Sequence, residues 1–151
     1  MKRLIVLALA ALLLAGPALG ADKVEVSGDS FVVDEAKSQS VFSGNVVVSH
    51  PSVKVWASQV EVQYGAGGPS DIKSFVARGA VKLETREQTA TGDLAVFDPR
   101  TQILTLSGNV KVTNATGTVD APQLTVDIKN NTSTFTGSKS GGRVTGVFTA
   151  P

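Results

Sequence analysis

One short pattern recurs along this chain, and the recurrence limits the available folds more than any other feature. In residues 104–112, apolar and polar side chains alternate on both sides of a glycine, a period of two that is typical of a β-strand. Similar stretches occupy 41–48 and 75–83, and a weaker copy occupies 133–137. The shared glycines are Gly44, Gly79, Gly108 and Gly137, separated by 35, 29 and 29 residues. The chain is therefore predicted to be an array of about four units of ~29 residues.

A second marker supports the same period. A short segment opening with Gly-Asp or Ala begins at positions 28, 57, 92 and 121, at intervals of 29, 35 and 29 residues. The longer second interval is explained by a glycine-rich insertion at 65–70. Both markers thus locate the same insertion between the same two strands.

The residue types between the markers predict an all-β chain. Valine, threonine and phenylalanine dominate from Val24 to Phe148, no helical period is evident, and turn residues recur at short intervals, as in 34–38, 98–101 and 129–132. Each unit is expected to supply two strands joined by a turn. Stacked units of this kind predict an elongated, rolled antiparallel sheet with one apolar interior along its length.

The alternation also predicts which side chains face that interior. The repeat glycines share this parity, so they are expected on the inward face, where they would let the sheet bend. The run 53–64 changes parity near Ala57, which predicts a bulge or a bend there. A dry core and a slot for an apolar ligand are both compatible with the pattern. The candidate interior residues are Phe42, Val46, Val62, Phe75, Val81, Leu83, Phe97, Leu104, Leu106, Val110 and Phe135.

The first twenty residues are predicted to be a cleaved secretory signal peptide. Lys2 and Arg3 precede an apolar run, and a small-x-small cleavage pattern ends at Gly20. The alternative, an uncleaved membrane anchor, is disfavoured because the apolar run is short. The mature chain, 21–151, is expected to form a single domain. The absence of cysteine excludes disulfides and a lipid-modified cysteine.

No pattern for catalysis, metal binding or nucleic-acid binding is found. His50 is the only histidine and lies in a predicted turn, where a surface position is expected. Acids recur at repeat positions but form no ligand-dense loop for calcium. They are Asp29, Asp34, Asp93, Asp98 and Asp127. Without Lys2 and Arg3, twelve basic residues stand against 13 acidic ones, with no basic stripe. We therefore expect no enzyme activity, no cofactor and no nucleic-acid partner.

The repeated motifs resemble those of the OstA/LptA family. The motifs are Ser-Gly-Asn-Val at 43–46 and 107–110 and Arg-Gly-Ala-Val at 78–81, and the resemblance covers roughly 24–137. The last copy departs from the pattern after Gly137. The resemblance implies a β-jellyroll, a periplasmic location and a role in lipopolysaccharide export. It also implies that the protein bridges an inner-membrane export complex and an outer-membrane translocon, with the acyl chains of lipid A sheltered in the interior.

Three other interpretations stay open at this stage. The chain could be a structural β-repeat protein with a dry core, a stand-alone relative of another component of the same export system, or a small periplasmic enzyme or inhibitor. Lipid that copurifies with the protein would favour the transport interpretation over the others.

The two ends of the predicted roll are candidate interfaces. A stacked sheet has a first and a last strand with unpaired backbone groups, and 23–27 and 143–148 are the segments expected there. Pairing of the last strand of one molecule with the first strand of another would give head-to-tail self-association. The alternative is a disordered tail after Gly137. The candidate interface residues are Val24, Val26, Val144, Val147 and Phe148.

Overall fold

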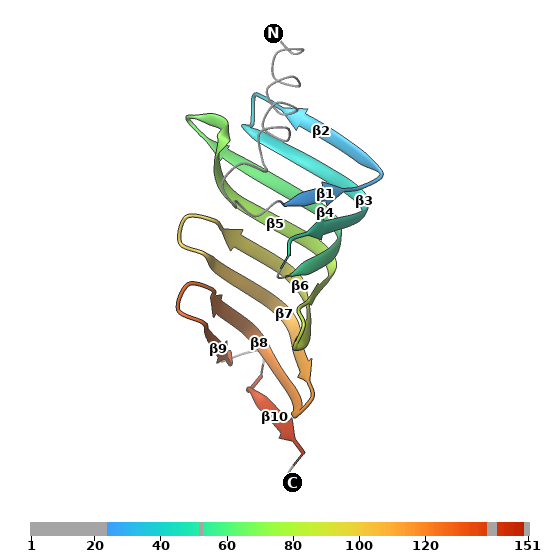
Figure 1. Ribbon diagram of the computed structural model, residues 1–151, viewed down its shortest axis with the longest axis vertical. Helices are drawn as coiled ribbons and strands as arrows, with labels where there is room; N and C mark the ends of the chain where they lie inside the picture. Colours follow the sequence, from blue (N-terminus) through green and yellow to red (C-terminus); the bar gives the residue numbers. More distant parts are fainter. Residues whose placement is uncertain (1–23, 52, 139–141, 150–151) are drawn as a thin grey trace.

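The computed structural model describes residues 24–51, 53–138 and 142–149, and every regular element in these ranges is a β-strand. The all-β prediction is confirmed: ten strands form one open antiparallel sheet (Figure 1). In the described part of the chain, no helix is long and apolar enough to cross a membrane. The strands are β1 (Glu25–Ser27), β2 (Ser30–Asp34), β3 (Gln39–Ser49), β4 (Lys54–Gly65), β5 (Gly68–Glu84), β6 (Gln88–Asp98), β7 (Ile103–Asn114), β8 (Gly117–Asp127), β9 (Thr132–Thr136) and β10 (Thr145–Phe148).

Strands β3 to β8 form the centre of the sheet, and each pairs with the next strand along the chain. At one edge, β1 and β2 pair with different parts of β3. At the other edge, β9 and β10 pair with different parts of β8. The strands therefore stack in chain order along the long axis, with β2 near one end and β10 near the other (Figure 1). Both predicted end segments are edge strands of this sheet.

The hairpin turns are held by the recurring acids. A carboxylate oxygen of Asp34 accepts a hydrogen bond from the backbone N–H of Lys37, and Asp98 accepts one from Arg100. Asp127 accepts hydrogen bonds from both the backbone and the side chain of Asn130. These bonds lower the pKa of Asp127 below its ordinary value of 3.8, the side-chain bond having the largest effect. The turn predictions are confirmed, and these carboxylates stabilise the turns by accepting hydrogen bonds.

The repeat glycines mark bulges in three alternate strands. Gly44, Gly79 and Gly108 have φ values of 79°, 81° and 79°, and the residue after each one is also left-handed. The strand register shifts at each of these pairs, on β3, β5 and β7. Only glycine fits the first position, because a Cβ on Gly108 would lie 2.5 Å from Oδ2 of Asp93.

The two sequence markers meet at these bulges. Asp29 lies beside Gly44 and accepts a hydrogen bond from the Asn45 side chain, and Asp93 does the same for Asn109 at 3.0 Å. The spacing between the markers therefore reflects a contact between neighbouring strands.

The predicted inward orientation of the repeat glycines is wrong. A Cβ on Gly108 would meet the exposed Asp93, on the outside of the sheet. The bulge holds two successive left-handed residues, Gly108 and Asn109, so the strand does not alternate regularly here. Leu106 and Val110 are buried in the interior, whereas Gly108 faces outward. Gly137 follows β9 and is not left-handed, so the fourth sequence copy has no such bulge. The parity change expected near Ala57 is observed, since Ala57 and Val60 are both buried. The register with β5 shifts between Trp56 and Gln59, but the extra residue lies on β5, at the Gly79 bulge.

Candidate functional site: an apolar groove inside the sheet

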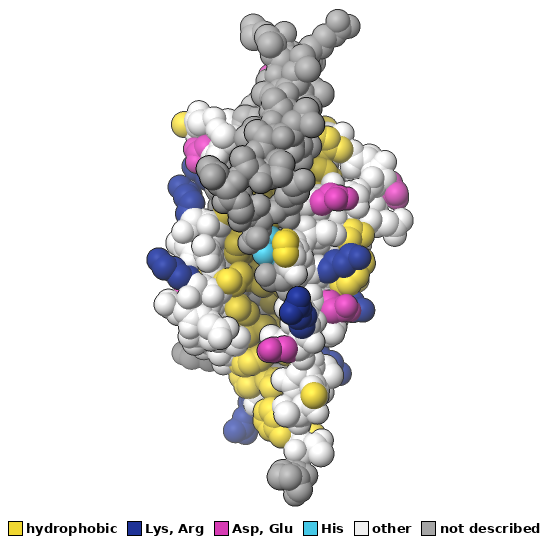
Figure 2. Space-filling model, viewed as in Figure 1, with side chains coloured by type: hydrophobic (Ala, Val, Ile, Leu, Met, Phe, Trp, Pro, Cys, Tyr) yellow, Lys and Arg dark blue, Asp and Glu magenta, His cyan; other side chains and the backbone are white. Residues whose placement is uncertain are grey.

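An open cavity of about 430 Å³ runs along the inner face of the sheet. Figure 2 shows it as a strip of hydrophobic side chains between more polar flanks. Thirteen of its fifteen lining residues are apolar. The lining residues are Val24, Val48, His50, Val53, Val55, Val60, Phe75, Ala77, Leu83, Ala95, Phe97, Pro99, Gln102, Leu104 and Ile128.

The centre of the groove is a row of directly opposed residues on neighbouring strands. Phe75 on β5 pairs with Phe97 on β6, which pairs with Leu104 on β7. The two phenyl ring centroids are 6.3 Å apart, within the range of a favourable aromatic contact. Because side chains directly opposite each other in a sheet lie on the same face, the row gives the groove a continuous apolar surface.

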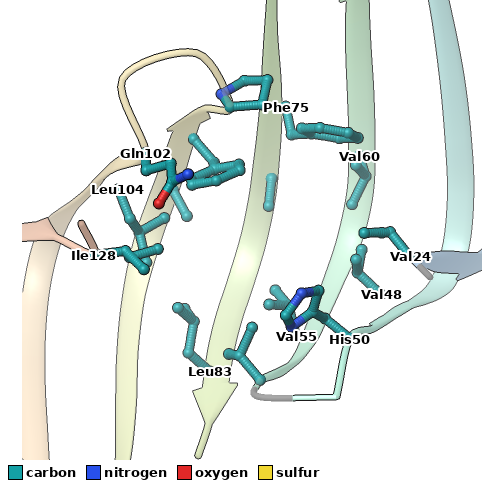
Figure 3. Close-up of a pocket in the computed structure, with 15 residues that line it drawn as sticks. Val24, Val48, His50, Val55, Val60, Phe75, Leu83, Gln102, Leu104 and Ile128 are labelled. Atoms are coloured by element: carbon teal, nitrogen blue, oxygen red, sulfur yellow. The ribbon is translucent and has the colours of Figure 1, made fainter. Parts of the chain in front are cut away.

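Two polar side chains lie at the rim. His50 belongs to the link between β3 and β4, and Gln102 ends the turn between β6 and β7. Figure 3 shows His50 next to Val55 and Gln102 next to Leu104, with apolar side chains between them. The expectation that His50 is only a surface turn residue misses this position, because it is half-buried and lines the groove.

The eleven predicted interior residues separate into three groups. Phe75, Leu83, Phe97 and Leu104 line the groove, and Leu83 is also buried. Val46, Val62, Val81, Leu106 and Val110 are buried, and we refer to these five as the floor. Phe42 and Phe135 are partly buried against the core but do not line the cavity. The alternation of the sequence thus identified the inward face, but it did not show which inward residues are buried and which line the groove.

The predicted interface residues also differ from one another. Val24 lines the groove, and Val26 on β1 packs against the core opposite Val48. Val144, Val147 and Phe148 are exposed, the last two by 67% and 64%. The C-terminal edge therefore presents apolar side chains to solvent, whereas the N-terminal segment contributes to the groove.

No metal-binding constellation is found within 24–51, 53–138 and 142–149, where no group of three His, Cys, Asp or Glu side chains is suitably placed. The buried side chain of Ser40 hydrogen-bonds Tyr64 at 2.6 Å, so this polar pair is satisfied. The chemistry of the inner face is therefore mainly apolar contact.

Comparison with known proteins identifies the family. The model of the LptA/(LptD N-terminal domain) LPS transport protein family matches residues 25–137. The chain therefore belongs to this family of lipopolysaccharide transport proteins, as the sequence motifs predicted.

A solved structure shows the same fold. The chain is similar to LptH of Pseudomonas aeruginosa, with a TM-score of 0.72 and 17% sequence identity. LptH is described as the LptA homologous periplasmic component of the lipopolysaccharide transport device. The match covers 85% of this chain and 96% of that one. The jellyroll architecture expected from the resemblance is thereby confirmed.

A curated relative, the uncharacterized protein R00383 of Rhizobium meliloti (strain 1021), is 28% identical over 91 residues. The match covers 56% of this chain and 49% of that protein, so the chain spans about half the length of the curated relative.

Proposed function

We propose that this protein is a periplasmic lipopolysaccharide carrier that shelters the acyl chains of lipid A in the groove. The observation that carries the proposal is the open apolar groove on the inner face of a lipopolysaccharide-transport fold. Each acyl CH₂ exposed to water costs about 0.8 kcal/mol, so a carrier must offer a sheltered apolar surface. A structural repeat protein with a dry core would not need such an opening.

The size of the groove suggests how the carrier is used. A volume of about 430 Å³ lies in the range of small-molecule sites, so one copy shelters only part of a lipid with several chains. Joining copies through the β1–β2 edge and the β9–β10 edge would extend the groove from molecule to molecule. We propose head-to-tail self-association of this kind and similar pairing with the inner-membrane and outer-membrane members of the same export system.

The location belongs to the same proposal. A signal peptide at 1–20, a mature domain at 21–151 and a periplasmic destination are supported by the sequence pattern. Residues 1–23 lie outside the described part of the chain. A mature N-terminus at Ala21 in protein recovered from the periplasm is the expected result of N-terminal sequencing.

Mass spectrometry of lipids retained by the purified mature protein tests the function. Lipopolysaccharide or lipid A should copurify in amounts that fall when Leu104 is replaced by glutamine, which places an amide in the groove. Thr105→Gln, on the outer face of the same strand, is the matched control and should retain wild-type amounts. Retention of no lipopolysaccharide by the wild-type protein would contradict the proposal.

A further inference from the structure

Two polar side chains lie in a groove that is otherwise apolar. Among the fifteen lining residues, only His50 and Gln102 carry hydrogen-bonding side chains. They come from loops that are far apart in the sequence, at positions 50 and 102. A groove that served apolar contact alone would not require either residue.

The backbone around Gln102 holds this residue in place at an energetic cost. Its N–H donates to the carbonyl of Asp98 at 2.8 Å, and its own carbonyl accepts from Ile128 at 3.0 Å. Its φ of 57° is left-handed. The equivalent turns have Ser38 and Asn131 at this position, with φ values of 51° and 54°. Asparagine tolerates this conformation well, whereas glutamine has no such preference but reaches further.

The link that carries His50 is similarly fixed. The N–H of His50 donates to the carbonyl of Val53 at 3.0 Å, and the N–H of Val53 donates back at 3.2 Å. This reciprocal pair places the imidazole at the rim of the groove, where it is half-buried. Neither other link between long strands, at 85–87 or at 115–116, contributes a residue to the groove.

From this placement we infer that His50 and Gln102 form a headgroup-reading pair, which donates hydrogen bonds to oxygen atoms where the acyl chains of a bound lipid meet its headgroup. An imidazole has at least one N–H donor in either protonation state, and an amide has two. The acceptors with suitable chemistry are phosphate oxygens and the carbonyl oxygens of the acyl linkages. The inference rests on the proposed lipid-binding function and adds that the groove distinguishes lipids by their headgroups.

The test compares ligands that share apolar character but differ in oxygen acceptors. Binding of bis-phosphorylated lipid A, the same lipid after phosphate removal, and the apolar dye N-phenyl-1-naphthylamine is measured for the mature protein. His50→Phe and Gln102→Met should each weaken binding of bis-phosphorylated lipid A about tenfold, the typical effect of one lost hydrogen bond to a charged group. Dye binding should be unchanged. His50→Gln, which keeps a donor, should restore most of the affinity.

The lipid without phosphates identifies the acceptor. If the substitutions weaken its binding as well, the contacts are to acyl-linkage carbonyls, and if they do not, the contacts are to phosphate. Thr101→Met and Ala115→Phe place the same side chains at exposed loop positions outside the groove and should leave all three affinities unchanged.

Three results would overturn the inference. An equal loss of lipid and dye binding would show that the two residues act only on the shape of the groove. Unchanged binding of both lipids in the double variant would show that they contact neither acceptor. Failure of the wild-type protein to bind either lipid would overturn the proposed function together with this inference, whereas the first two results leave that function intact.

Discussion

On β7, floor and groove residues occupy the same face of one strand, yet they differ in burial. Leu106 and Val110 are each 1% exposed, whereas Leu104 on the same strand and Phe75 on β5 line the open cavity. The difference follows the distance from the bulge. Leu106 and Val110 are two residues from Gly108, and Leu104 is four residues away. A β-bulge bends the strand that carries it, so packing changes over a few residues along β7.

This comparison indicates how one β-sheet divides two tasks. On β7, Leu106 and Val110 beside the bulge pack closely, and Leu104 nearer the hairpin contributes to the groove, whereas on β5 Ala77 lines the groove although it lies two residues from Gly79.

Truncating the floor and the groove should have very different effects. Leu106→Ala removes a fully buried side chain and should lower the free energy of unfolding by about 3 kcal/mol, with a cavity left behind. Leu104→Ala removes a side chain already in contact with open space and should cost about 1 kcal/mol. Urea unfolding measures both, and equal losses would break the distinction between floor and groove.

Replacing the bulge glycine of β7 should destabilise the folded protein. Gly108→Ala adds a Cβ 2.5 Å from the Asp93 carboxylate at a left-handed φ, and should lower the free energy of unfolding by about 2 kcal/mol. Gly68→Ala shares the left-handed φ of 78° but meets no atom within 4 Å, so it should cost only about 1 kcal/mol. Combining Gly108→Ala with Asp93→Ala should recover the part of the lost unfolding free energy that comes from the steric contact with Asp93. The absence of any recovery would argue against this contact.

The edges offer a comparison with the centre of the sheet. Deleting 138–151 removes β10, whose Val147 and Phe148 are exposed, but leaves β3 to β9 paired. The shortened protein should unfold at nearly the same urea concentration, because little apolar surface is lost. Concentration-dependent association, followed by light scattering, should disappear. Persistent association would exclude the C-terminal edge as the joint.

The smallest expected effect is a pH dependence at one turn. Hydrogen bonds from Asn130 lower the pKa of Asp127 in the folded protein below its ordinary value of 3.8. The folded state therefore favours the carboxylate, and the resulting stability is present above about pH 3.8 and is lost as the pH falls through the lowered pKa. In Asn130→Ala, unfolding measured across this range should show a weaker decline than in the wild-type protein. An identical decline would assign the acid sensitivity to other groups.

Sequence alone was sufficient for the strands, the turns and the inward face, because alternation and turn chemistry are local. It placed Phe97 and Leu106 correctly on the inner face, but it could not separate groove from floor, since depth depends on how the sheet bends. The predicted inward orientation of Gly108 was wrong, because two successive left-handed residues break the regular alternation of side chains along the strand. His50 and Gln102 lie in loops, where alternation carries no information, so their place at the groove emerged only from the fold.

In the proposed function, the groove, and not the outer face, holds the acyl chains. A photo-crosslinking amino acid placed at Phe75 or Leu104 measures this directly in cells that make lipopolysaccharide. Lys111, on the outer face of β7, is the control position. We expect lipopolysaccharide adducts at positions 75 and 104 and none at 111. Equal labelling at all three positions, or labelling at 111 alone, would contradict it.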